Sequence, residues 1–403
     1  MRNKKRVVVT GIGIVSSIGV GKDAFWKGVI NGRSGVRNIT SIDVEPFKCR
    51  RAAEVKNFKP QEYINPKKLK FLGRTSQFAI AAAKLAVKDA NIKTFSPFED
   101  KVGVMAGTTV GERPMEEIVE NWARGNKEKV TKQKVLQAAA YNISDNVAIE
   151  LGVKGTSALI PTACSAGNYA IGYAYDCIRS GSLRFALAGG AESFSKIAFA
   201  GFQRLYAMSD DVCRPFDLNR KGMMLGEGAG MLLLEDIDSA INRGANIYAE
   251  VLGYGLSCDA HHITAPNVDG VSLALSKALK DAGLKPEDVD YISAHGTGTP
   301  ANDKIESQAI RAVFGKHADS LYVSSLKSMI AHTMGASCAI AAGMCSLALT
   351  EKIIPPTINY QTPDPECDLN YVPNEAIGAD IKVVVNNGFA FGGNNCCVVF
   401  GAV

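Results

Sequence analysis

Ile160-Pro-Thr-Ala-Cys-Ser-Ala-Gly-Asn168 is the most informative stretch of this 403-residue chain. An apolar stretch leads into a turn of small residues, and apolar residues then recur at helical spacing as far as Ser180-Gly181. This pattern places Cys164 near the N-terminus of a buried helix. Unpaired backbone N–H groups and the positive end of the helix dipole favour a thiolate there. We therefore predict a lowered pKa for Cys164 and a role as nucleophile.

The other nine cysteines have ordinary structural settings. A free cysteine usually behaves as a small buried hydrophobe. Neighbouring cysteines do not have the spacing of paired metal ligands, and the adjacent Cys396 and Cys397 have no histidine close by in the sequence. We therefore predict no metal site, and only Cys164 has a catalytic context.

Outward from this stretch, short β-rich runs alternate with helical patterns along the whole chain. We predict strands at 6–9, 101–105, 184–188, 248–252, 291–293, 321–324 and 382–385, and helices at 74–90, 166–180, 271–282, 304–314 and 335–350. This alternation is typical of an α/β protein. A new strand follows Asn242-Arg-Gly-Ala245, so we predict two intimately packed halves, residues 1–245 and 246–403.

Composition favours a cytoplasmic enzyme. The chain is 46% apolar with a net charge of +5, so it can bury a large core and has too little positive charge to indicate a nucleic-acid partner. The basic start is followed by only Val7-Val-Val9, which is too short for a secretion signal. The low-charge stretch 336–350 is too short and too rich in small residues to span a bilayer, so we expect a buried helix and no membrane partner.

Four basic residues cluster before the helix predicted at 74–90: Lys67, Lys68, Lys70 and Arg74. We call this cluster the basic edge. It could meet an acidic partner or be a solvated helix face, and the residues alone do not decide between the two.

Two of the five histidines sit where a strand gives way to a loop. His295 opens the turn His295-Gly-Thr-Gly-Thr-Pro300, and His332 precedes the buried helix at 335–350. Sites in α/β proteins are built at such strand ends, so Cys164, His295 and His332 could converge on one pocket. A cysteine with two imidazoles indicates acyl-thioester chemistry.

The ordered motifs resemble one family over essentially the whole chain. They are Val7-Val-Val-Thr-Gly-Ile-Gly13, Thr162-Ala-Cys-Ser165, Arg214-Pro-Phe-Asp217, Gly226-Glu-Gly-Ala-Gly230, Ala294-His-Gly-Thr-Gly-Thr-Pro300, Lys327-Ser-Met329 and Gly388-Phe-Ala-Phe-Gly-Gly393. The chain thus resembles the β-ketoacyl-acyl carrier protein synthases of the thiolase superfamily, in particular the synthase II type.

The resemblance implies a thiolase fold, with two similar βαβαβ halves in five α-β-α-β-α layers, normally as a homodimer. It also implies a two-stage reaction without a bound cofactor, whose substrates ride on the phosphopantetheine of acyl carrier protein. Cys164 would first take an acyl group from acyl-carrier protein. Malonyl-carrier protein would then lose carbon dioxide and attack the acyl-cysteine, giving a 3-oxoacyl chain.

The family pattern also implies residue roles. His295 and His332 would donate N–H bonds to the developing enolate, and the N–H groups of Cys164 and Phe391 would form an oxyanion hole. The other matched positions are a buried charged pair, Lys327 and Glu306; the acyl gate, Phe391; the acyl pocket, Val110; and carrier-protein contacts, Lys67, Lys70 and Arg214. An ordinary surface ion pair is the alternative for Lys327 and Glu306.

Several positions depart from the family pattern. Ala390 and Ala331 stand where glycine is usual before the gate and before His332, and we expect Ala390 to stiffen the gate. The segment between Met208 and Arg214 is shortened, and Phe71 replaces a usual basic residue. Ser293 and Ala341 replace ligands that hold a metal ion in some members, so we predict no such ion.

Two enzyme interpretations stay open: a synthase that elongates fatty acids, and one that builds polyketide or polyene chains beside a chain-length partner. The altered gate and the shortened segment favour the second. A non-condensing, chain-length-factor-like subunit is disfavoured because such subunits usually lack the cysteine. A Cys/His hydrolase would leave the other motifs unexplained. The sequence does not determine acyl length, saturation, or homodimer against heterodimer.

Overall fold

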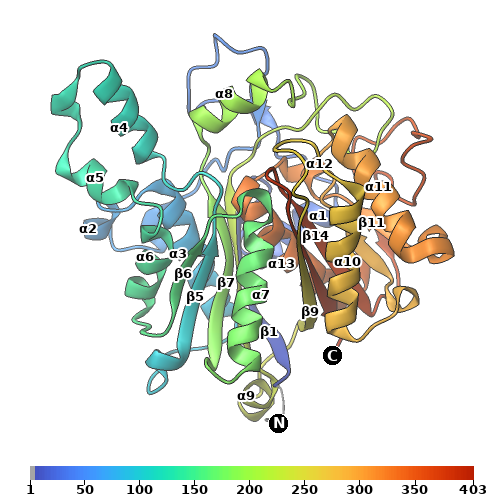
Figure 1. Cartoon of the computed structure of the whole chain (residues 1–403). Coiled ribbons are helices and arrows are strands. Elements are labelled where there is room, and N and C mark those ends of the chain that lie inside the picture. The colour runs from blue at the N-terminus through green and yellow to red at the C-terminus, as the bar shows by residue number, and fades with distance from the viewer. Residues whose placement is uncertain (1–4) are drawn as a thin grey trace.

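The computed structural model describes residues 5–403, and an 11-stranded mixed sheet runs through its centre (Figure 1). The strands in sheet order are β11 (Tyr322–Ser324), β10 (Tyr291–Ser293), β14 (Val383–Phe389), β15 (Asn394–Gly401), β9 (Ala249–Cys258), β1 (Val7–Ser16), β8 (Gly228–Asp236), β7 (Phe185–Glu192), β5 (Val102–Gly107) and β6 (Ser157–Ile160), with β2 (Gly19–Val20) beside β1. The predicted α/β class is confirmed.

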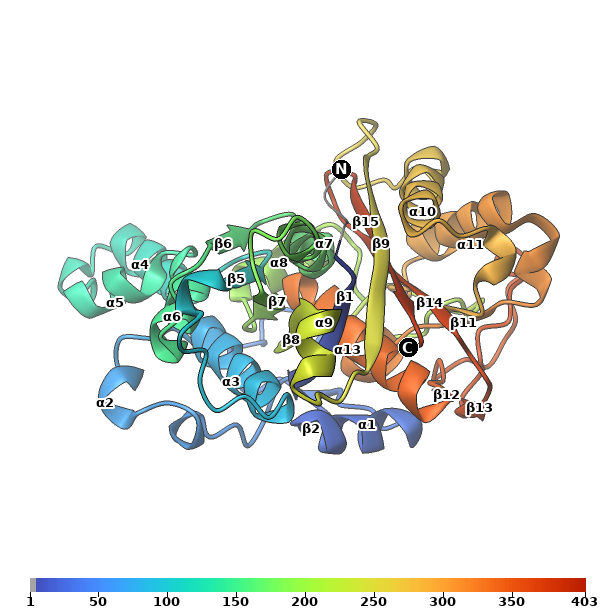
Figure 2. The same cartoon turned by 90° about the horizontal axis from the view of Figure 1, so that it is seen from below.

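The sheet consists of two halves that meet at one short seam. β1 pairs with β8 along most of its length, but it pairs with β9 only where Val7 to Val9 face Ala249 to Val251. Beyond this seam the half-sheets diverge, and helices fill the space between them (Figure 2). The division at residue 245 stays a prediction.

Helices form the three layers around and between the half-sheets. The middle layer is α7 (Ala166–Arg179) and α13 (Ser337–Glu351), each of which contacts strands of both halves. Outer layers are α3 (Arg74–Asp89) with α6 (Asn142–Leu151), and α10 (Val268–Ala282) with α11 (Pro300–Phe314). The predicted five-layer α-β-α-β-α arrangement of a thiolase fold is confirmed.

α13 explains the longest apolar stretch of the sequence. A helix that is apolar on all sides belongs in a core or a membrane. Met334–Glu351 is the one helical segment of the described residues that has the length and composition to span a bilayer, and 89% of it is buried inside the fold. It therefore forms the core between the half-sheets.

The remaining elements cover the ends of these layers. They are α1 (Lys22–Ile30), α2 (Pro66–Leu69), α4 (Pro114–Ala123), α5 (Lys132–Ala138), α8 (Lys196–Arg204), α9 (Ile237–Asn242), α12 (Lys327–Ile330), and the small sheets β3 (Arg37–Asn38) with β4 (Arg51–Ala52) and β12 (Ile353–Ile354) with β13 (Ile377–Gly378).

The first strand is longer than the sequence predicted. β1 continues through Gly11 and Gly13 to Ser16, although the prediction ended it at residue 9. A Cβ atom at Gly11 would lie 2.1 Å from the carbonyl oxygen of Ala86, and one at Gly13 would lie 1.8 Å from that of Ala82. These glycines therefore allow α3 to approach the strand closely, and they do not end it.

Candidate active site

Cys164 lies where the prediction placed it, between β6 and α7. It is the middle residue of a 3₁₀ turn, Ala163–Ser165, which runs directly into α7. Ala163 has φ +51°, a left-handed conformation that is uncommon outside glycine and that turns the chain sharply before the cysteine. The carbonyl oxygen of Cys164 accepts a hydrogen bond from Cys338 Sγ at 3.1 Å.

The predicted fall in the pKa of Cys164 is contradicted. Only 6% of the residue is exposed, and burial raises the pKa of its thiol to about 12. Cys338 and Glu192 raise it further, while the positive charge of Lys327 lowers it. The cost of burying a thiolate thus outweighs the stabilisation that the helix N-terminus gives it. The resting group is a neutral thiol.

His295 and His332 face each other from two neighbouring loops. His295 follows β10, and His332 follows α12 after the adjacent strand β11. Their ring centroids are 5.3 Å apart with planes 84° apart, and both residues are buried. The predicted convergence of the two histidines is therefore present.

Hydrogen bonds assign the same tautomer to both rings. His332 Nδ1 accepts from the backbone N–H of Met334 at 3.1 Å, and Lys327 Nζ donates to His295 Nδ1 at 3.4 Å. An imidazole whose Nδ1 accepts must, when neutral, carry its proton on Nε2. Each ring therefore keeps an Nε2–H donor.

Both imidazoles are neutral. Burial lowers the pKa of His295 well below its ordinary value, and Lys327 and His332 lower it further. Burial and the charge of Lys327 also lower the pKa of His332. A buried cation next to the pair thus keeps both rings as N–H donors.

Lys327 and Glu306 are buried, but they do not form the predicted direct pair. Among residues 5–403, no ion pair joins their two side chains. Glu306 instead accepts from the backbone N–H groups of His295 at 2.8 Å and Gly296 at 2.7 Å, and Lys327 Nζ donates to the carbonyl oxygen of His295. Their charges therefore act on His295 from two sides, and Glu306 raises the pKa of Lys327 against the lowering by burial.

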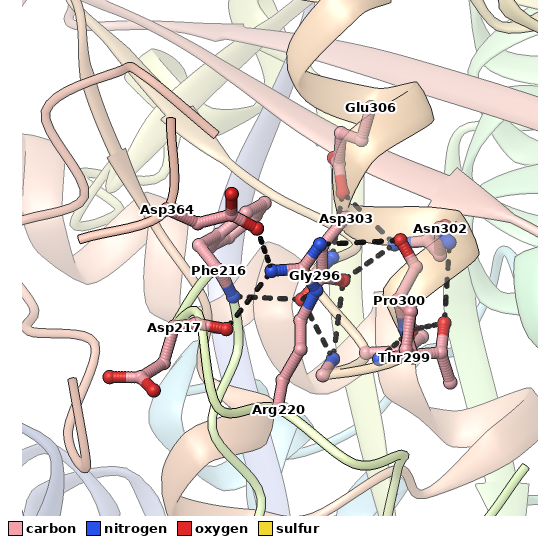
Figure 3. A network of polar contacts seen from close by, with 12 residues as sticks. Phe216, Asp217, Arg220, Gly296, Thr299, Pro300, Asn302, Asp303, Glu306 and Asp364 are labelled. Atoms are coloured by element: carbon pink, nitrogen blue, oxygen red, sulfur yellow. Dashed lines mark hydrogen bonds and ion pairs between the residues drawn. The ribbon is translucent and has the colours of Figure 1, made fainter. Parts of the chain in front are cut away.

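A buried polar network fixes the loop that carries His295 (Figure 3). Asp303 accepts from the N–H groups of Phe216 at 2.8 Å and Gly298 at 3.1 Å. Arg220 lies beside it, with Nε 3.8 Å from Asp303 Oδ2, and also pairs with Asp364. The helix α11 thus anchors the turn after β10 through Asp303 and Glu306.

Cys164, His295, His332 and Phe391 line one cavity of about 320 Å³. Other lining residues include Phe202, Leu205, Tyr206, Met223, His262, Ile263, Thr297, Thr299 and Asn302. His262 lies in the loop between β9 and α10, which contributes to the lining of this cavity. The cavity opens to the surface and reaches the thiol and both rings, so a thioester can enter it.

Phe391 lies at the mouth of this cavity and is 37% exposed. Its backbone N–H donates to no described residue, so it is free to bind a developing oxyanion. Gly392 and Gly393 after it have φ of +83° and +77°. Ala390 does not have a positive φ, so its methyl group adds no left-handed strain to the gate.

Val110 is not among the residues that line the cavity. It packs against a buried apolar cluster that includes Phe194 and Phe199, and its backbone N–H donates to Glu192 Oε1 at 3.1 Å. Glu192 also accepts from Thr109 and Gly335, so it ties the Val110 loop to the start of α13. Glu192 is not among the residues predicted from the sequence, although a carboxylate that ends an apolar strand is a recognisable signal.

Ala331 adopts a conformation that normally requires glycine. Its φ is +56° and its ψ is −168°. Such a residue stores about 1–3 kcal/mol of strain unless its surroundings enforce the conformation. This departure from the family pattern therefore places strain directly before His332.

Only half of the basic edge is free. Arg74 binds Glu227 at 2.7 Å, and Lys68 binds Glu150 at 2.7 Å, so both charges are already paired within the chain. Lys67 and Lys70 are exposed on and just after α2, whereas Arg214 is held by Asp211 and Gln361. Phe71 is exposed beside Lys70, whose Nζ lies 5.0 Å from its ring centroid.

Within residues 5–403, histidine, cysteine and acidic side chains form no group of three that could hold a metal ion.

The chain matches two sequence profiles of one family. "Beta-ketoacyl synthase, N-terminal domain" matches residues 4–240, and "Beta-ketoacyl synthase, C-terminal domain" matches residues 248–361. The chain is 41% identical over 407 residues to the 3-oxoacyl-[acyl-carrier-protein] synthase 2 of Synechocystis sp. (strain ATCC 27184 / PCC 6803 / Kazusa), covering 98% of each chain.

Two solved structures have closely similar folds. The ishigamide ketosynthase/chain length factor matches with a TM-score of 0.96 and 45% identity, over 99% of this chain and 100% of that one. A type II PKS acyl-carrier protein in complex with its ketosynthase bound to the hexaketide matches with a TM-score of 0.91 and 35% identity, over the same shares of the two chains.

Proposed function

The chain belongs to the β-ketoacyl synthase family, and from this membership we propose which of its residues carry out the condensation. It is an acyltransferase that joins an acyl group to a malonyl unit, with both substrates carried on phosphopantetheine. The observation that supports the assignment is the meeting of Cys164, His295, His332 and Phe391 in one cavity.

In the first half-reaction, Cys164 Sγ attacks the carbonyl carbon of the acyl thioester. The N–H groups of Cys164 and Phe391 stabilise the oxyanion that forms. The bond to the pantetheine sulfur then breaks, and the proton of the Cys164 thiol ends on that sulfur. The thiol is neutral at rest, so this transfer accompanies the attack and requires no stored thiolate.

In the second half-reaction, the malonyl carboxylate leaves as carbon dioxide and its electron pair forms an enolate. The two Nε2–H groups of His295 and His332 donate to the enolate oxygen where the charge develops. The enolate carbon attacks the acyl carbon on Cys164, and the bond from that carbon to Cys164 Sγ breaks. The thiolate that leaves takes up a proton from water. Because both rings are neutral donors, they stabilise the enolate without first losing a proton.

The exposed Lys67 and Lys70 support a carrier protein as partner, because their charges suit an acidic surface. A reduced compartment, the cytoplasm, suits the ten free cysteines of the described chain.

We further propose that the functional unit is a dimer. β6 is the last strand of the sheet and pairs only with β5. On the same side, the pair α4 and α5 projects from the fold and exposes Val119, Trp122, Val135 and Leu136 (Figure 1). An unpaired edge beside exposed apolar side chains favours a second chain there, identical or of the chain-length-factor type.

Of the two pathways, we propose polyketide or polyene synthesis. The similarity to the ishigamide ketosynthase/chain length factor and to the type II PKS ketosynthase supports it, as does the shortened segment between Met208 and Arg214. A non-condensing subunit is the second candidate, but nothing in the site favours it because the nucleophile and both histidines are in place.

Intact mass after incubation with a panel of acyl-carrier proteins tests this function. We expect a mass gain of one acyl group on the wild type, none on Cys164→Ala, and discharge when malonyl-carrier protein is added. Preference for saturated long chains would contradict the polyketide assignment. A wild-type chain that gains no acyl group, alone or with a partner subunit, would contradict the condensing role and favour the second candidate.

A further inference from the structure

A closed set of hydrogen bonds lies in the middle layer of the fold, next to the turn that carries Cys164. It joins α7, α13 and β14 through three residues, Asn168, Cys338 and Asn386. Asn168 and Asn386 are completely buried, Cys338 is 1% exposed, and none of the three lines the cavity. Amides buried at this depth are costly unless they are hydrogen-bonded, and the bonds that they make fix the geometry around them.

Asn168 and Asn386 bind each other reciprocally. Asn168 Nδ2 donates to the backbone carbonyl oxygen of Asn386 at 2.9 Å, and Asn386 Nδ2 donates to Asn168 Oδ1 at 2.9 Å. Asn168 Nδ2 also donates to the carbonyl oxygen of Cys396 on β15 at 3.0 Å. Asn386 Nδ2 also donates to the carbonyl oxygen of Cys338 on α13 at 2.9 Å. The amide pair thus ties α7 to both neighbouring strands, and β14 to α13, by directed bonds.

Cys338 closes the set at the nucleophile. Its Sγ donates to the carbonyl oxygen of Cys164 at 3.1 Å, and Asn168 lies about one helical turn after Cys164. The Cys164 turn is therefore held twice, by α13 through its own carbonyl group and by β14 through the first turn of α7. Gly388 on β14 leaves room for both contacts, because a Cβ atom there would lie 2.5 Å from Cys338 Sγ and 3.3 Å from Asn168 Nδ2.

β14 leads directly to the other N–H of the proposed oxyanion hole. Asn386 faces the middle layer, and Asn387 faces the opposite side of the sheet, where its Nδ2 donates to Glu306 Oε1 at 3.0 Å. The strand ends at Phe389, two residues before Phe391. It is thus fixed on both faces just before the loop that carries the second N–H.

We propose that Asn168, Asn386 and Cys338 are positioning residues, which hold the Cys164 turn in register with β14 and so set the spacing of the two N–H groups in the oxyanion hole. This inference rests on the proposed function, since it takes the N–H groups of Cys164 and Phe391 as that hole. Such a hole acts through donors held in fixed places, and a displacement of about 1 Å can slow a reaction by about a hundredfold.

The two half-reactions should respond differently to the loss of this set. Acyl transfer to Cys164 uses the oxyanion hole, whereas decarboxylation of the malonyl unit uses the N–H groups of His295 and His332. A purely structural role would instead reduce both rates together, in proportion to the folded enzyme that is lost.

The ratio of acylation to decarboxylation tests the proposal. Single-turnover acylation is followed by intact mass, with the acyl-carrier protein of the panel that loads the wild type fastest, and carbon dioxide release from malonyl-carrier protein is measured on the same preparation. We expect Asn168→Leu and Asn386→Leu each to slow acylation by about tenfold or more, while decarboxylation stays within about twofold of the wild type. Cys338→Ala should lower the ratio less, and Cys338→Ser, which keeps a donor, should resemble the wild type.

Thr10→Val is the matched control. Thr10 is also completely buried, its Oγ1 donates to Glu235 Oε1 at 2.6 Å, and neither residue lines the cavity, so its ratio should equal that of the wild type. The same ratio for the two leucine variants as for Thr10→Val would overturn the proposal. Equal ratios for Cys338→Ala and Cys338→Ser would also overturn it, and this pair decides the question even if neither leucine variant folds. A wild type that loads from no member of the panel would contradict the proposed function itself.

Discussion

We predict that Lys327→Met greatly slows the decarboxylation of malonyl-carrier protein while the enzyme still folds. Lys327 Nζ donates to Nδ1 of His295 at 3.4 Å and also to its carbonyl oxygen. Methionine has a similar length and no donor. The variant therefore loses the bond that holds the His295 proton on Nε2, and it loses the charge that lowers the pKa of both rings.

The magnitude follows from the loss of one directed donor. One such N–H is worth about 3 kcal/mol in a transition state, so decarboxylation should fall by about a hundredfold or more. The unpaired His295 carbonyl should destabilise the fold by about 1–3 kcal/mol. This cost is partly offset because no ammonium group is buried in the variant.

Three measurements check the Lys327 prediction: the rate of carbon dioxide release, the free energy of unfolding in urea, and the ¹⁵N shifts of the imidazole nitrogens. Lys304→Met is the control, because Lys304 lies nearby on α11 but pairs with Glu366 at the surface. An unchanged decarboxylation rate would refute the positioning role of Lys327. A wild-type spectrum with the His295 proton on Nδ1 would refute the tautomer.

Three further results are expected. Alkylation of Cys164 by iodoacetamide should accelerate with pH and show no plateau below about pH 9, because burial raises the thiol pKa to about 12; a plateau near neutrality would contradict this. Burial raises the pKa of Glu192 from 4.5 to about 7. Between these two pH values the native state therefore keeps a proton on Glu192 that the unfolded state has lost. The stability from this proton is complete below the unfolded pKa and is lost as the pH rises through about 7, by about 3 kcal/mol. Glu192→Gln should flatten this dependence in urea unfolding at a series of pH values, and an unaltered slope would contradict the assignment. Charge reversal of Lys67 and Lys70 to glutamate should raise KM for carrier-bound substrate and leave activity on a small thioester unchanged, whereas equal losses on both would rule out a carrier contact.

The sequence predicts the fold well where the spacing of apolar residues indicates which face of a helix or strand is buried. The turn at Cys164, the helix after it and the strands before His295 and His332 all lie as expected. Prediction failed at Gly11 and Gly13, which were interpreted as the end of a strand. Their function is close packing against α3, and that contact spans a long separation in the sequence.

The electrostatics of the site could not be predicted in the same way. A helix N-terminus, which would lower the pKa of the Cys164 thiol, can be recognised in the sequence. The burial that raises this pKa instead depends on the packing of α13 against the turn. The ion pair expected between Lys327 and Glu306 is replaced by separate contacts with His295. Three-dimensional placement therefore determines which group each charge meets.

The roles of Cys164, His295 and His332 are tested by measuring decarboxylation and acyl transfer separately in single variants. Cys164→Ala should still release carbon dioxide from malonyl-carrier protein but take no acyl group. His295→Ala and His332→Ala should each lose about a hundredfold or more in decarboxylation, and both should still gain an acyl group by intact mass. Carbon dioxide release that is independent of both histidines would contradict the account, as would acyl transfer that persists without Cys164.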